Sequence, residues 1–294
     1  MGKLKLSLLV SGLTLLVVGF QNCSKYQFAD AQVARGKSTG LGTDGLPLPS
    51  GAGGGSDTPA GTGATGLPTP AEVEARDWLS ANCDESQIRQ KPISLSFSAS
   101  GGSVSVSQIS QSSIEISDKK SVRAQQLTAG TLVIKKTELL EIQQVQAEKI
   151  SIEALVINKI QQMHADEIRV HANSVDAFQQ ISAVSTSGTK LQLIAKTANT
   201  IQQVSTLCLR TNSTQKIQQV AFVKVFGDGA DAKVDQIQQV EELSIIDAEV
   251  DSIQQVHILV LKNSKVKRVH QVQKLVLINS SVEEMSQVSE VVEQ

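Results

Sequence analysis

A four-residue motif, Ile-Gln-Gln-Val, recurs along most of the chain, and its spacing constrains the fold more than any other feature. Clear copies begin at Ile142, Ile160, Phe178, Ile201, Ile217, Ile237 and Ile253, and weaker copies begin at Val106, Ala124, Val269 and Met285. Successive copies are separated by 18, 18, 18, 18, 23, 16, 20, 16, 16 and 16 residues. This period is shorter than that of leucine-rich or helical repeats and fits one coil of a parallel β-solenoid.

The repeat that begins at Ile237 carries apolar residues at places 1, 4, 7, 9 and 14, as Ile237, Val240, Leu243, Ile245 and Val250, and the repeats from Ile253 and Val269 follow it. Places 7 and 9 alternate with polar or outward residues, which indicates a strand, and Asn263-Ser264 and Asn279-Ser280 are typical turn residues. We expect an all-β, single-chain parallel β-solenoid of about ten coils of 16 to 18 residues, forming a rod roughly 50 Å long. A coiled coil is disfavoured because a 16-residue period does not keep a heptad seam.

Aromatic residues are scarce, at 3% of 294 residues, with one Trp, one Tyr and six Phe. Stacked columns of Val and Ile would form a narrow core for which a ring is too large. We therefore expect Trp78 to lie outside the solenoid core, on its cap or flank. The formal charge of −2 and the lack of rings disfavour nucleic-acid binding and base stacking.

The N-terminal residues have the layout of an export signal, with Lys3 and Lys5 before an apolar run from Leu6 to Phe20. Cys23 follows after Gln21 and Asn22. This segment resembles the processing site of a bacterial lipoprotein, and the Phe-Gln-Asn-Cys variant is similar to that of predatory Gram-negative bacteria. The resemblance implies a signal peptide at 1–22 and lipidation of Cys23. With Ser24 in the sorting position it implies an outer-membrane anchor, on the periplasmic or the cell-surface side.

Three further segments follow the signal. Residues 23–68 are rich in Gly, Ser, Thr and Pro and form a flexible tether, with a mean reach of roughly 35 Å. Residues 69–92 are expected to contain a short capping helix, from 70 to about 82, and a connection, since Thr69-Pro70 is a helix-start signal. Residues 93–294 form the solenoid. Insertions at 182–190 and 226–231 lengthen two coils, and in solenoids such loops are usual binding places.

Place 3 of the repeat is Gln in every copy, whereas place 2 is Gln in eight copies and Ser107, His270 or Ser286 in the others. Amides at one height on successive coils can bond to each other, so we expect an amide ladder along the rod at place 3. The alternative is a column that faces outward and binds a glycan or another repetitive surface. The place-3 residues are Gln108, Gln126, Gln144, Gln162, Gln180, Gln203, Gln219, Gln239, Gln255, Gln271 and Gln287.

Two cysteines remain once Cys23 is lipidated. Cys208 lies between Leu207 and Leu209 and should point outward, so a Cys83–Cys208 disulfide would attach the N-terminal helix to the side of the rod. No metal or cofactor is expected. The histidines, which we expect at the surface, and the acidic residues of the 228–235 segment lack metal-ligand spacing. These residues are His164, His171, His257, His270, Asp228, Asp231 and Asp235.

The residues contain no recognisable nucleophile-base-acid set, so catalysis is not expected. In coil length and aliphatic columns the repeat resembles the bactofilin type of β-helix. We expect a tethered envelope lipoprotein with a structural or surface-binding role. One alternative is a carbohydrate-active β-helix with an unrecognised site. Another is a solenoid that assembles end to end through its last coil, with Glu283, Glu284, Glu290 and Glu293 as guards against assembly. The partners expected are the membrane, a glycan or protein on a solenoid face, or a second copy, and not nucleic acid.

Overall fold

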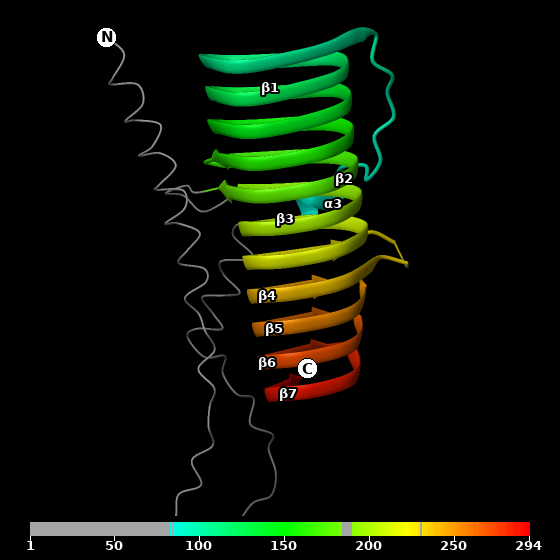
Figure 1. Cartoon of the computed structure of the whole chain (residues 1–294). Helices are drawn as coiled ribbons and strands as arrows, with labels where there is room; N and C mark the ends of the chain where they lie inside the picture. The colour runs from blue at the N-terminus through cyan, green and yellow to red at the C-terminus, as the bar shows by residue number, and fades with distance from the viewer. Residues whose placement is uncertain (1–82, 84, 184–189, 230) are drawn as a thin grey trace, which may run out of the picture. The chain divides into compact units, whose positions relative to one another are not determined.

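The repeats form one parallel β-sheet wound into a solenoid (Figure 1). The structure is a computed structural model and describes residues 83, 85–183, 190–229 and 231–294. The signal, Cys23, the tether, the helix expected at 70–82 and Trp78 lie outside these residues. The elements are α3 (Glu85–Gln90), β1 (Gly101–Ala165), β2 (Glu167–Ala183), β3 (Lys190–Gly227), β4 (Lys233–Ile246), β5 (Glu249–Lys262), β6 (Lys265–Ile278) and β7 (Ser281–Glu293). The strands neighbour each other in sequence order, so the expected fold class is confirmed.

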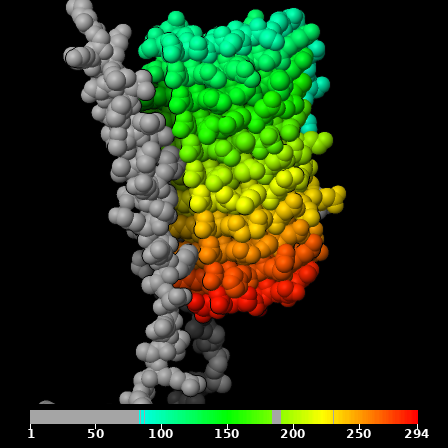
Figure 2. All heavy atoms as spheres, viewed as in Figure 1, coloured from blue at the N-terminus to red at the C-terminus, as the bar shows by residue number. Residues whose placement is uncertain are grey.

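The coils stack so that equivalent repeat places lie directly above one another. Ile237 pairs with Ile253, and Ile253 with Val269, in steps of one repeat. The same holds where the repeat length changes, because Ile168 pairs with Leu191 across the longest coil. The extra residues are therefore accommodated outside the paired positions, and the columns continue through them. Figure 2 shows the resulting closely packed layers.

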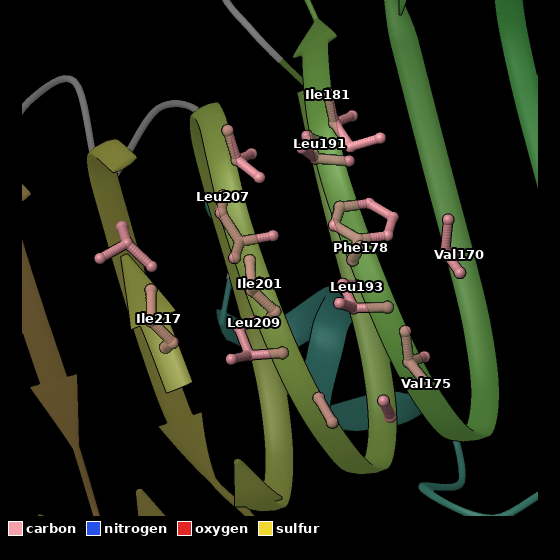
Figure 3. Close-up of a cluster of buried hydrophobic side chains, with 14 of the residues drawn as sticks. Val170, Val175, Phe178, Ile181, Leu191, Leu193, Ile201, Leu207, Leu209 and Ile217 are labelled. Carbon is pink, nitrogen blue, oxygen red and sulfur yellow. The ribbon is translucent and has the colours of Figure 1, made fainter. Parts of the chain in front are cut away.

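The interior is a continuous aliphatic column, as the repeat predicts. The residues at places 1, 4, 7, 9 and 14 of the Ile237 repeat are at most 2% exposed. The expectation that a ring does not fit was wrong, because Phe178 is fully buried in this core beside Leu191 and Leu193 (Figure 3). The repeat determines which places face the interior, but the volume available at each place depends on the side chains of its own and the adjacent coils.

The Ile-Gln-Gln-Val motif is a corner of the coil. In the nine copies from Ala124 to Val269, places 1 and 4 point inward and are buried, while the two residues between them point outward. Strict strand alternation allows one outward residue between two inward ones, so a turn in the backbone is required. The Gln at place 3 supplies it, since all eleven copies have φ between 53° and 57°. A second left-handed corner occurs in some coils, at Asp118, Lys136, Asp247, Asn263 and Asn279.

Residues 91–100, here called the strap, lead from α3 along the outside of the coils to the start of β1 (Figure 1). Asn173 holds the strap by two bonds with Leu95: the Leu95 amide donates to Oδ1 at 2.6 Å, and Nδ2 donates to the Leu95 carbonyl at 2.8 Å. The Ala99 amide donates to Oε1 of Glu138 at 2.8 Å. The strap thus crosses several coils, and the backbone groups of Leu95 and Ala99 are bonded to side chains of those coils.

Candidate interaction surfaces

One outer face of the solenoid is already occupied by α3. Cys83, just before the helix, forms a disulfide with Cys208, with the two Cα atoms 5.6 Å apart. Cys208 points away from the core, as expected, because Leu207 and Leu209 on either side belong to the interior cluster. The element attached to the rod is therefore α3 and the strap.

A second apolar cluster lies between α3 and the outer face of the sheet. It contains Ile88 of the helix and Ile194, Phe226 and Ile246, with Ile93 of the strap packed against it. Phe226 is fully buried although it lies outside the interior column. Outward-facing residues of successive coils thus form a small core of their own.

Arg210 fixes the C-terminal end of the helix to the rod. Its guanidinium donates to the carbonyl oxygens of Ile88 at 3.0 Å and Arg89 at 3.2 Å, and also to that of Lys91. It forms an ion pair with Asp228, with a 2.9 Å bond from Nε to Oδ1. The last carbonyl oxygens of a helix lack partners within the helix, and a cation there is favourable. The side chain of Arg210, which is 9% exposed, supplies both the hydrogen-bond donors and the positive charge.

Arg89 makes a second polar contact between the helix and the sheet. Its Nη2 donates to Oδ2 of Asp247 at 2.6 Å, its Nε donates to Glu85 at 2.9 Å, and its guanidinium lies 5.7 Å from the Phe226 ring centroid. These contacts involve part-exposed groups and contribute less than the buried Arg210 pair.

Two of the acidic residues in the segment from 228 to 235 form ion pairs within the fold. Asp228 pairs with Arg210, and Asp235 lies 3.4 Å from the ammonium of Lys233. Asp231 is exposed. Among the residues that the structure describes, no three His, Cys, Asp or Glu side chains are grouped to hold a metal ion.

The expectation of four surface histidines was wrong for His171. His171 is 6% exposed and lies on the outer face near the strap, while His257 is exposed and His164 and His270 are half-buried. Burial lowers the pKa of His171, the nearby Lys91 lowers it further, and Glu153 and the backbone of Pro92 oppose the shift. The Nε2 atom is buried without a hydrogen-bond partner. The position beside the strap thus disfavours the protonated form of His171.

The hydrogen bonds between side-chain amides do not follow the ladder expected at place 3. Two intercoil bonds join place-2 residues, from Gln238 Nε2 to Gln254 Oε1 at 3.1 Å and between His270 Nδ1 and Ser286 Oγ at 2.7 Å. Gln202, also at place 2, donates diagonally to Gln219 at 3.4 Å. Within the described coils, no bond joins one place-3 amide to the next. The Gln residues at place 3 are exposed or half-buried.

The last coil forms one end of the described stack, drawn red in Figure 2. Met285 and Val291 of β7 are 50% and 44% exposed, although their equivalents Val269 and Leu275 in β6 are buried. Glu290 pairs with Lys274 at 3.1 Å, and Glu283, Glu284 and Glu293 are exposed. The edge therefore combines apolar and acidic groups.

The repeat pattern does not predict the interface residues Arg210 and Asn173. Both lie at outward places, and such residues vary from coil to coil. Arg210 follows Cys208 by two residues, so strand alternation puts the two side chains on one face. That relation was a usable signal, whereas nothing in the sequence marked Asn173.

No described helix is long and apolar enough to cross a membrane. No protein family model, no curated protein and no solved structure matches the chain. The chain is therefore identified by its architecture, as a parallel β-solenoid of aliphatic coils with an outer face that carries a disulfide-linked helix.

Proposed function

We propose that this chain is a membrane-tethered lipoprotein whose solenoid has a structural or surface-binding role in the bacterial envelope, without catalysis. The observation that carries the proposal is the attachment of α3 and the strap to the side of the rod by the Cys83–Cys208 disulfide. Structural disulfides persist in oxidising compartments, which agrees with the export signal before Cys23. The proposed similarity of the solenoid to bactofilins is based only on coil length and aliphatic columns.

The test is metabolic labelling of the full chain with a fatty-acid analogue in a Gram-negative host. We expect label in the membrane fraction of the wild type and none in Cys23→Ala. Protease added to intact cells then distinguishes the cell surface from the periplasm. A soluble, unlabelled wild-type chain with free cysteines would contradict the proposal. Turnover of purified peptidoglycan or a pectin-like polymer would instead favour the carbohydrate-active alternative.

A second candidate function is end-to-end assembly through β7. The exposure of Met285 and Val291 favours it, because a second copy stacked on this coil would bury both side chains and pair the strand edge. The acidic residues of β7 oppose it, since they would be desolvated. The chain should then form filaments as its concentration rises, and Met285→Glu should abolish them. A monodisperse monomer at high concentration would refute assembly.

A further inference from the structure

Place 3 is Gln in every copy of the repeat, although the backbone conformation there does not require Gln. All eleven adopt the left-handed conformation, which favours Gly and, among other residues, Asn and Asp. The second corner shows what this conformation accepts in the same protein. It is occupied by Asp118, Lys136, Asp247, Asn263 and Asn279. A backbone requirement alone would therefore give mixed residues at place 3 as well.

Hydrogen bonding between coils does not explain the invariance either. The intercoil bonds at this corner begin at place 2, and within the described coils the one place-3 amide that takes part is Gln219. Place 2 nevertheless accepts Ser107, His270 and Ser286. Place 2, whose side chains bond between coils, has varied. Place 3 has not varied, although most of its amides are exposed or half-buried and make no intercoil bond; the exceptions are Gln219, which accepts one, and Gln180, whose Oε1 is buried.

Recent duplication is also excluded as the reason. Residues next to the corner have diverged, since place 5 is Gln146, His164, Glu241 and His257 in different copies. Gln has remained at place 3 throughout this divergence. Something that contacts the amides from outside the fold would account for the difference.

We propose that the place-3 column is a binding ridge for an uncharged, linear polysaccharide bearing hydroxyl or acetamido groups. This assignment deepens the proposed binding role and rests on it. Neighbouring amides lie roughly one coil spacing apart, about 4.8 Å, and each has two donors and one acceptor oxygen. A polymer along the ridge can meet one amide after another, and many weak contacts add up to avidity.

The surroundings of the ridge favour a neutral polymer. The residue just before the corner is Arg123, Glu141, Lys159 and Glu284 in different coils, so no field of one sign runs along it. A second copy of the chain fits less well. A stable dimer uses about 800 Å² per partner, and a corner only two residues wide offers a narrow contact. A single polymer chain needs only the row of amides.

The experiment measures cosedimentation of the purified full chain with chitin and with cellulose, and polygalacturonate serves as the charged polymer. The column variant carries Gln→Ala at Gln126, Gln144, Gln239 and Gln271. Alanine keeps the Cβ, so the cost of the left-handed backbone is unchanged. The control variant carries the same change at Gln111, Gln146, Gln215 and Gln273, which are exposed but lie outside the column.

We expect the wild type and the control variant to bind at least one neutral polymer, and the column variant to bind about tenfold or more weakly. If the alanine set lowers the unfolding midpoint, the matching Gln→Asn set shortens the amides and should weaken binding in the same direction. Equal binding by all variants, no binding to either neutral polymer, or tighter binding to polygalacturonate would overturn the proposal. Self-association that only the column variant loses would assign the ridge to a second copy instead. A wild type that binds while the column variant is unaffected leaves the broader binding role standing.

Discussion

Replacing Arg210 with Met should release α3 and the strap from the solenoid without unfolding the coils. The side chain is 9% exposed and bonds to three carbonyl groups and to Asp228. Methionine keeps its apolar volume but makes none of these bonds. Loss of one partner of a buried ion pair costs about 3–5 kcal/mol. Asp228 is 22% exposed, so water compensates in part and the lower value, about 3 kcal/mol, applies.

That cost is local, because α3 contacts only a small part of the sheet. A loss of about 3 kcal/mol raises the population of the undocked helix roughly 100-fold, since 1.4 kcal/mol corresponds to a factor of ten. Hydrogen exchange should therefore accelerate by this factor at residues 85–100, while the interior strands keep their protection. The disulfide retains the segment near the rod and leaves it accessible to protease.

The matched control is Arg169→Met, which removes an exposed ion pair with Glu167 and should cost at most about 1 kcal/mol. A double-mutant cycle with Asp228→Asn isolates the pair from the carbonyl contacts. Unchanged exchange at residues 85–100 in Arg210→Met would refute the reasoning. Equal acceleration in the interior strands would refute it too, because the helix would then unfold only together with the coils.

Four further outcomes are expected from urea unfolding. Phe178→Ala should lower the free energy of unfolding by about 3–5 kcal/mol, because it leaves a cavity in the core, and a loss below 1 kcal/mol would contradict the fully buried ring. The variant with serine at both Cys83 and Cys208 should lose about 2–5 kcal/mol, since the bond closes a loop with a sequence separation of 125, and reductant should then have no further effect. The pKa of His171 is lower in the folded protein than its ordinary value near 6.5. The free energy of unfolding is therefore unaffected by this residue above that pH and falls as the pH drops below it. His171→Leu should therefore reduce the loss of stability below that pH, and the same dependence of unfolding free energy on pH as in the wild type would contradict this expectation. Burial first, and then Glu241, raise the pKa of Glu242, so its charge is unfavourable above that pKa, and Glu242→Gln should stabilise the protein at pH 7 but not at pH 4.

The coil interior was predictable because its contacts repeat with the sequence. Each interior residue lies against its equivalent one repeat away, so the spacing of Ile237, Ile253 and Val269 contains both the strand pairing and the register. Phe178 shows the limit of this reasoning. The repeat defines which side chains share the core, but the volume available to each one depends on its neighbours in adjacent coils.

The corner illustrates a subtler limit. The sequence shows that Gln is constant at place 3 and variable at place 2, and it therefore suggested a ladder at place 3. The left-handed backbone at place 3 turns that residue, and the intercoil bonds form at place 2 instead. A residue type that is constant along the repeat indicates that its side chain is important. The local backbone conformation determines which groups that side chain can contact.

The sequence by itself determined the solenoid, its aliphatic columns and the outward direction of Cys208. In a periodic fold each interior residue contacts its equivalent one repeat away, so the repeat spacing predicts these contacts. The docking of α3 was decided only by the tertiary structure. It depends on Arg210, Phe226 and Asn173 meeting a segment that lies far away in the sequence and occurs only once. Such contacts have no period, and they form because the helix has unpaired carbonyl groups and an apolar side that need partners on the rod.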